Sequence, residues 1–170
     1  AATSEVINKL INALEDQDEE VRHSARKALG RIGAKAVTNE VINKLLNALG
    51  VQDQRVRAEA CVVLGQMGEK AATSEVINKL VNVLGDQDQR VRTRACIALG
   101  EIGEKAATTE VINKLINVLA DQDEWVKRKA CEALGQMGEK AATPEVINKL
   151  INALGEQDKD ARIGACEAFE

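Results

Sequence analysis

Apolar residues recur every three or four positions along this chain of 170 residues, as they do on one face of an amphipathic helix. In the first repeat of the pattern, one apolar arc consists of Val6, Ile7, Leu10, Ile11, Ala13 and Leu14. A second arc consists of Val21, Ala25, Ala28, Leu29 and Ile32. Polar residues lie opposite both arcs. The pattern therefore predicts two short helices joined by a tight turn.

The hexapeptide EVINKL begins at residues 5, 40, 75, 110 and 145, so the two-helix pattern repeats with a strict period of 35. The copies run over residues 1–35, 36–70, 71–105, 106–140 and 141–170, of which the last is truncated. One pair of short helices cannot bury both of its apolar faces, whereas stacked pairs form a continuous core. The sequence therefore predicts a single repeat domain over residues 1–170 with an all-α, α-solenoid fold.

The ends of the helices are predicted from capping residues. Pro144 favours the first position of a helix, which makes Thr143 the predicted N-cap. The same role is predicted for its counterparts Thr3, Thr38, Thr73 and Thr108. The predicted N-caps of the second helices are Asp18, Asp53, Asp88, Asp123 and Asp158. Gly33 is expected to end the second helix, and Gly30 inside that helix indicates close helix packing or a bend.

The second-helix segments DEEVRHSARKALGRIG, DQRVRTRACIALGEIG and DEWVKRKACEALGQMG follow a common pattern, VRxxAxxALGxIG, with few departures. In tandem, this pattern resembles HEAT-like repeats of the phycobilisome-lyase type, and it is also similar to artificial binding proteins built on consensus HEAT-like repeats. The resemblance implies a right-handed superhelix of stacked helix pairs whose second helices line the inner, concave side. It implies a protein-binding scaffold, with lyase-like handling of a chromophore as the enzymatic alternative.

The copies differ most on one face of the second helix, whereas the outward face of the first helix is nearly uniform. The variable positions are spaced by 3, 4 and 7 residues, which places them on one side of a helix. The candidate partner-binding residues are Arg55, Glu59, Val62, Arg90, Arg94, Ile97, Trp125, Arg128, Lys129 and Glu132. Trp and Arg are frequent interface hot spots. Alternatively, this face is solvated surface under few packing constraints.

Charge and composition narrow the class of partner. With Glu101 included, the candidate face carries five basic and three acidic residues, which favours a protein or peptide partner with acidic and apolar groups. The formal net charge of the whole chain is -4 and its pI is near 5.3, which argues against nucleic acid and anionic membranes as partners. No apolar run approaches the roughly 20 residues that span a bilayer, and no signal segment is recognised. We therefore expect an intracellular, reducing location, or a recombinant product.

Candidate groups for chemistry are few. Cys61, Cys96, Cys131 and Cys166 occupy one repeat position, which Arg26 fills in the first copy. We expect these thiols to fill tight sites between repeats, because a spacing of 35 does not fit a metal site or a disulfide framework. His23 is the single histidine and is expected to be exposed on its helix. Helix capping accounts for the acidic turn around Asp16 and Asp18. The sequence thus predicts no enzyme activity, no cofactor and no metal.

Three alternatives stay open at this point. Ten asparagines, Asn8 and Asn12 with their counterparts, either form hydrogen bonds between repeats or present a second ligand surface. The truncated last copy is expected to leave apolar surface, which favours head-to-tail self-association. In the third alternative, the chain is a consensus or excised repeat array that has no evolved partner.

Overall fold

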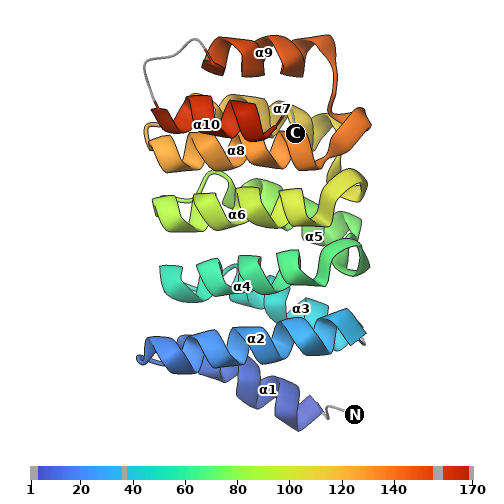
Figure 1. Cartoon of the computed structure of the whole chain (residues 1–170). Coiled ribbons are helices and arrows are strands. Elements are labelled where there is room, and N and C mark those ends of the chain that lie inside the picture. Colours follow the sequence, from blue (N-terminus) through green and yellow to red (C-terminus); the bar gives the residue numbers. More distant parts are fainter. Residues whose placement is uncertain (1–3, 36–37, 155–158, 169–170) are drawn as a thin grey trace.

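The computed structural model describes residues 4–35, 38–154 and 159–168, and these residues form a stack of helix pairs in two layers (Figure 1). The first helices are α1 (Ser4–Asn12), α3 (Asn39–Ala48), α5 (Ser74–Val83), α7 (Thr109–Val118) and α9 (Pro144–Leu154). The second helices are α2 (Glu19–Lys35), α4 (Gln54–Met67), α6 (Gln89–Ile102), α8 (Glu124–Gln136) and α10 (Lys159–Glu167). The described residues contain no β-strand, and the predicted all-α solenoid is confirmed.

The capping residues act as the sequence predicts. Thr38, Thr73 and Thr108 are N-caps, and each side-chain oxygen accepts a hydrogen bond from the backbone N–H three residues later. The Thr143 hydroxyl accepts the equivalent bond from Val146. Asp53, Asp88 and Asp123 are the N-caps of the second helices, and their carboxylates accept from backbone N–H groups two or three residues later. Asp18 accepts a hydrogen bond from the N–H of Glu20 at 2.8 Å. Thr3 and Asp158 lie outside the described residues.

Glycine is the C-cap of α4 and α6, and in the fourth repeat it follows the C-cap Met137 of α8, whereas the first repeat differs. Gly68, Gly103 and Gly138 have φ angles of 57°, 71° and 65°, which favour glycine, and each begins a short 3-10 helix. These 3-10 helices are η2 (Gly68–Ala71), η3 (Gly103–Ala106) and η4 (Gly138–Lys140), and η1 (Ala13–Glu15) follows α1. The prediction for Gly33 is wrong, because α2 continues through it to Lys35. Alanine, the best helix former, follows Gly33 where the later copies have glutamate.

The core is aliphatic and runs along the whole stack. It includes fully buried leucines from both layers, namely Leu14, Leu29, Leu45, Leu64, Leu80, Leu99, Leu115 and Leu134. Each buried leucine contributes about 1.5–3 kcal/mol relative to an exposed one. Val21, which was predicted to be buried, is 40% exposed. It lies in the first repeat, and its counterparts in the middle repeats are covered by the repeat before them.

Neighbouring second helices approach one another closely at the repeated glycine inside each helix. A Cβ atom added to Gly65 would lie 2.9 Å from the Cα of Ala98, and one added to Gly100 would lie 3.0 Å from the Cα of Ala133. The close helix packing predicted from the glycine inside the second helix is therefore confirmed at Gly65 and Gly100, whereas an added Cβ at Gly30 would meet only the side chain of Gln66. The second helices contact one another much more extensively than the first helices do.

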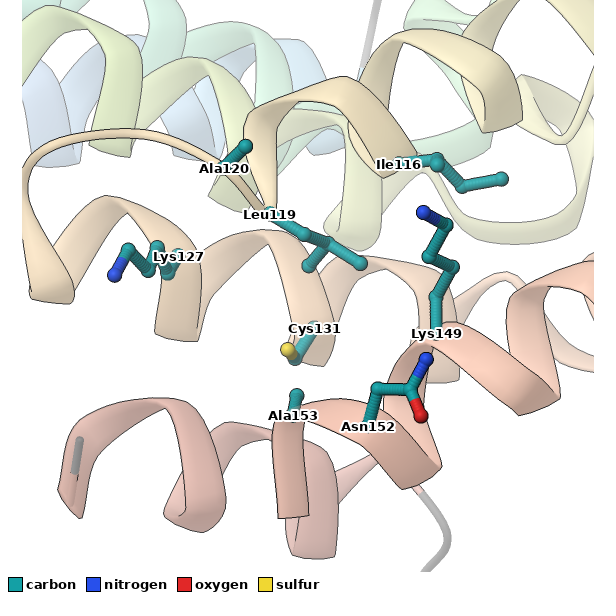
Figure 2. Close-up of a pocket in the computed structure, with 8 residues that line it drawn as sticks. All are labelled: Ile116, Leu119, Ala120, Lys127, Cys131, Lys149, Asn152 and Ala153. Atoms are coloured by element: carbon teal, nitrogen blue, oxygen red, sulfur yellow. The ribbon is translucent and has the colours of Figure 1, made fainter. Parts of the chain in front are cut away.

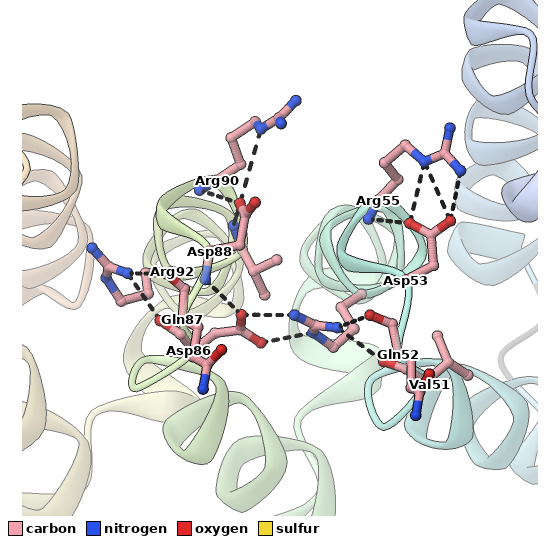
Figure 3. A network of polar contacts seen from close by, with 11 residues as sticks. Val51, Gln52, Asp53, Arg55, Asp86, Gln87, Asp88, Arg90 and Arg92 are labelled. Atoms are coloured by element: carbon pink, nitrogen blue, oxygen red, sulfur yellow. Dashed lines mark hydrogen bonds and ion pairs between the residues drawn. The ribbon is translucent and has the colours of Figure 1, made fainter.

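A ladder of arginine and aspartate side chains joins successive repeats on the turn side of the stack (Figure 3). Arg57 donates to Asp86 of the next repeat through Nε and Nη2, at 2.7 and 2.8 Å, and its Nη1 donates to the carbonyl oxygens of Val51 and Gln52. Arg92 repeats this arrangement with Asp121. The paired side chains are only 11–17% exposed. The ladder fixes the register of the second repeat against the third and of the third against the fourth.

The ladder also changes the protonation of its carboxylates. Burial raises the pKa of Asp86, but hydrogen bonds from Arg57 and from the backbone N–H of Asp88 outweigh it, so the pKa lies below its usual value. The pKa of Asp121 is lowered in the same way, with Arg92 as the main donor. Both aspartates are therefore charged at neutral pH.

Candidate partner-binding groove

An open groove with a volume of about 680 Å³ crosses the N-terminal halves of α2, α4, α6 and α8. It gathers seven of the ten candidate residues, namely Arg55, Glu59, Arg90, Arg94, Ile97, Trp125 and Lys129. Val62, Arg128 and Glu132 do not line it. Side chains that were not among the ten candidates also line the groove, among them Arg26, Gln54 and Gln89.

Trp125 is the most exposed large apolar side chain of the groove, at 47%. It lies in the first turn of α8, just after the N-cap Asp123. The guanidinium carbon of Arg128 and the Nζ of Lys129 each lie 5.0 Å from the centre of its ring. Such cation–π contacts orient an aromatic ring. One turn of α8 therefore holds the indole at the surface instead of in the core.

Glu132 holds the two cations that contact Trp125. Its carboxylate accepts from the Nε of Arg128 at 2.9 Å and from the Nζ of Lys129 at 2.5 Å. Arg128 also lies 3.9 Å from Asp160 of the next repeat. Both cations are less than one-fifth exposed. Of these three side chains, only Lys129 lines the groove, and Arg128 and Glu132 contact Trp125 or its neighbours from outside it.

Three of the four acidic groups that line the groove already have partners within the protein. Glu59 forms an ion pair with Arg26 at 2.7 Å, and Asp88 and Asp123 are N-caps. Asp53, at the edge of the groove, accepts from the Arg55 side chain, and this bond is the main reason that its pKa falls to about 2. Arg26 was detectable in the sequence as the one departure from the row of cysteines.

Two arginines of α6 extend into solvent within the groove. The Arg90 side chain is 73% exposed and lies 3.9 Å from Asp88, too far for a hydrogen bond. Arg94 is exposed one turn later and has no ion pair within residues 4–35, 38–154 and 159–168. Burial raises the pKa of nearby Glu101, and the charge of Arg94 opposes that rise. The groove therefore presents two guanidinium groups beside one indole.

The cysteines separate into buried and exposed members. Cys61, Cys96 and Cys131 are buried and Cys166 is exposed, and none of the four forms a disulfide. Burial raises the pKa of Cys61 to about 12 and raises that of Cys96 as well. The prediction that these residues fill sites between repeats thus fails for Cys166, which is exposed. Cys131 lies between Leu119 and Ala153 in a pocket of about 350 Å³ between α7, α8 and α9 (Figure 2).

The asparagine rows contribute little to contacts between repeats. Asn8 accepts a hydrogen bond from the Lys44 side chain of the second repeat. The other nine asparagine side chains are exposed to solvent. His23 is also exposed, as predicted, and lies within hydrogen-bond distance of Arg26. Within the described segments, no helix is both long and apolar enough to cross a membrane. No group of His, Cys, Asp or Glu residues suited to a metal ion occurs among the described residues.

The stacked helix pairs and the groove across one layer define the chain as an α-solenoid repeat protein. A family model of HEAT repeats matches residues 7–78, 42–112 and 77–170, and the chain therefore belongs to the HEAT-repeat family. This confirms the resemblance seen in the second-helix pattern. No curated protein gives a significant sequence match.

Solved structures show the same fold at low sequence identity. The complex of CpcE and CpcF of phycocyanin lyase from Nostoc sp. PCC7120 contains a chain with a TM-score of 0.82 and 17% identity, covering 99% of this chain and 100% of that one. An engineered protein from the Northeast Structural Genomics Consortium has a TM-score of 0.70 and 21% identity, over 95% and 77% of the two chains. A designed armadillo repeat protein in complex with the peptide (KR)4 has a TM-score of 0.67 and 21% identity, and the match covers 96% of this chain and 80% of that one.

Proposed function

We propose that this protein is a non-enzymatic scaffold that binds a protein or peptide in the second-helix groove. The observation that carries this proposal is the convergence of seven residues that vary between copies in one open groove across four helices. The closer packing of the second helices supports their position on the inner, concave side of the stack. The preformed groove lowers the ordering cost of binding. Four cysteines that form no disulfide fit a reducing, intracellular setting.

The chemistry of the groove favours an acidic partner that carries an apolar group. Six basic side chains line the groove against four acidic ones, and three of those acids are held by Arg26 or by helix capping. Arg90 and Arg94 lie one turn apart and suit paired carboxylates, which guanidinium groups bind bidentately. Trp125 offers the apolar contact. The designed armadillo neighbour holds a peptide of Lys and Arg, and the charge of this groove favours the opposite sign.

Peptide selection with purified protein tests the proposal. A displayed library of random peptides is selected against the wild-type chain, and the enriched peptides are measured by calorimetry against wild type, Trp125→Ala and Asn82→Ala. Asn82 is exposed on the first-helix face and is the matched control. A hot-spot tryptophan contributes 2 kcal/mol or more, which corresponds to about 30-fold in affinity. We expect that loss for Trp125→Ala and no change for Asn82→Ala.

Two results would contradict the proposal. Equal affinity of wild type and Trp125→Ala would place the binding site elsewhere on the molecule. Failure to enrich any peptide would favour the alternatives of a solvated surface or of a consensus array that has no evolved partner. Thermal unfolding of Trp125→Ala serves as the folding control. Little change is expected there, because the indole is outside the apolar core.

A further inference from the structure

One contact of the arginine–aspartate ladder is missing between the first and second repeats. The ladder position that holds Asp86 in the third repeat holds Val51 in the second repeat. The arginine that would pair with an aspartate there is Arg22, the counterpart of Arg57 and Arg92. The first repeat therefore keeps the guanidinium group of the ladder, although the second repeat does not supply the carboxylate.

The turn before α2 holds Arg22 in the same way as the other ladder arginines are held. The Nη1 of Arg22 donates to the carbonyl oxygens of Asp16 and Gln17 at 2.7 and 2.8 Å. Arg57 and Arg92 also donate through Nη1 to the carbonyl oxygens of the residues six and five positions before them. The guanidinium group of Arg22 is therefore anchored as in the intact ladder contacts.

The other edge of this guanidinium group is open. In the intact contacts, Nε and Nη2 of the arginine donate to the two oxygens of one aspartate, at 2.7–2.9 Å (Figure 3). Within the described parts of the chain, Nε and Nη2 of Arg22 have no acceptor. Val51 stands at the aspartate position, and its side chain has only methyl groups to offer. Two neighbouring donors of Arg22 therefore lack the bidentate carboxylate that suits them.

The acidic residues of the turn do not prevent a further carboxylate from binding. Asp16 accepts a hydrogen bond from the backbone N–H of Asp18, and Asp18 accepts one from that of Glu20. Aspartates at the same two positions make the same bonds in the third repeat, where Arg92 nevertheless binds Asp121. A turn of this kind thus leaves its arginine able to bind one more carboxylate.

Arg22 is also accessible from the groove, which the intact ladder arginines are not. It lines the groove together with Arg26, whereas Arg57 and Arg92 do not. Arg26 is already paired with Glu59 at 2.7 Å, so its charge is satisfied within the protein. The open edge therefore belongs to a guanidinium group that a partner in the groove can reach.

We propose that Arg22 is a carboxylate-binding site of the groove, where a carboxylate of the partner takes the place of the ladder aspartate. The assignment rests on the proposed function and deepens it, because it gives one acidic group of the partner a specific residue. The carboxylate belongs either to an Asp or Glu side chain or to the C-terminus of the partner, since both present two oxygens to a guanidinium group. Because the turn already anchors Nη1, Arg22 loses little freedom on binding.

Val51→Asp tests the proposal, because it supplies the missing carboxylate from within the chain. The substitution keeps Arg22 and completes the ladder contact, so the site is filled before a partner binds. Gln52→Asp is the matched control, because it adds the same charge one residue away, at an exposed side chain outside the ladder. The probes are two peptides of alternating Glu and Leu, one with a free C-terminus and one with a C-terminal amide. Calorimetry measures the affinity of each peptide for each protein.

We expect Val51→Asp to weaken peptide binding at least about tenfold, because hydrogen bonds to a charged group are lost, and Gln52→Asp to bind nearly as wild type does. A loss confined to the peptide with the free C-terminus would identify a terminal carboxylate as the ligand. An equal loss for both peptides would identify a side-chain carboxylate.

The failure of this proposal differs from the failure of the proposed function. If wild type and Val51→Asp bind both peptides equally, Arg22 is not the site, although the groove still binds acidic peptides. An equal loss in Gln52→Asp would show general charge repulsion and would also overturn the assignment. If wild type binds neither peptide, the binding of acidic partners is contradicted, and the assignment of Arg22 falls with it.

The Nε–H signals of the arginine side chains in NMR spectra provide a second readout at the site itself. The signal of Arg22, assigned by its loss in Arg22→Lys, should shift as the Glu–Leu peptide saturates wild type. The signals of Arg57 and Arg92 should stay unchanged, because aspartates already occupy these groups. In Val51→Asp the Arg22 signal should not respond to the peptide. An unchanged Arg22 signal in saturated wild type would place the carboxylates of the partner elsewhere in the groove and overturn the proposal.

Discussion

Replacing Gly65 with alanine should destabilise the protein, although alanine is the better helix former. Gly65 lies inside α4, where glycine costs about 1 kcal/mol relative to alanine. On helix propensity alone, the substitution would therefore stabilise the fold. It tests whether close approach of the second helices, and not local conformation, requires glycine at this repeat position.

The structure sets the size of the opposing effect. The new Cβ would lie 2.9 Å from the Cα of Ala98 and 3.3 Å from its Cβ, whereas carbon atoms pack best at about 3.5–4.0 Å. It would also meet Oε2 of Glu101 at 2.1 Å, but that side chain can swing into solvent. The backbone of α6 cannot move as freely. Overpacking of this kind costs about 1–3 kcal/mol, so we expect a net loss of about 1 kcal/mol.

Urea unfolding followed by circular dichroism measures this loss, and Gly85→Ala provides the matched control. Gly85 lies in the turn after α5, where an added Cβ would find its nearest contact at 3.6 Å. The fourth repeat carries Ala120 at that position. The control should gain about 0.4–1 kcal/mol, because alanine restricts the unfolded chain. If Gly65→Ala is stabilised as much as Gly85→Ala, close helix approach is not the reason for the glycine.

Three further predictions concern the ladder and the thiols. Asp86→Asn should lower the free energy of unfolding by about 2 kcal/mol at neutral pH. Because the pKa of Asp86 is lowered on folding, the difference in stability between the variant and wild type should shrink as the pH falls below about 4. Acid titrations of both proteins would measure this change. Val51→Asp places a carboxylate in the ladder position facing Arg22. A double-mutant cycle of this change with Arg22→Ala should give a favourable coupling energy of about 0.5–1 kcal/mol. Zero coupling would contradict the alignment of the first repeat against the second that the ladder implies. In dilute native protein, Cys166 alone should react rapidly with a thiol reagent, and the three buried thiols should react only on unfolding.

The fold could be predicted almost completely from the sequence, because each feature depends on local spacing. Thr143 was identified as an N-cap from the proline that follows it, and the period of 35 placed its counterparts. The Arg57–Asp86 contact was not predicted, although both positions recur with the same period. Its partners lie 29 residues apart, and pairing them requires the distance between stacked turns, which no local pattern contains.

The candidate groove was predicted only in part, because local spacing does not show how side chains contact one another. Helical spacing placed Trp125, Arg128 and Glu132 on one face of α8, but it could not say which of them point into the groove. The structure separates them, because Glu132 holds Arg128 and Lys129 against the indole.

A fluorescence titration tests the binding of acidic partners most directly. Trp125 is the single tryptophan and the chain has no tyrosine, so its emission reports on the groove alone. Two peptides of equal length and equal leucine content are compared, one with Glu and one with Lys at every other position. We predict that the Glu peptide causes a saturable change in emission that Arg90→Glu with Arg94→Glu abolishes, whereas the Lys peptide causes none. Equal responses to both peptides, or saturable binding of the Glu peptide to the doubly substituted protein, would contradict the account.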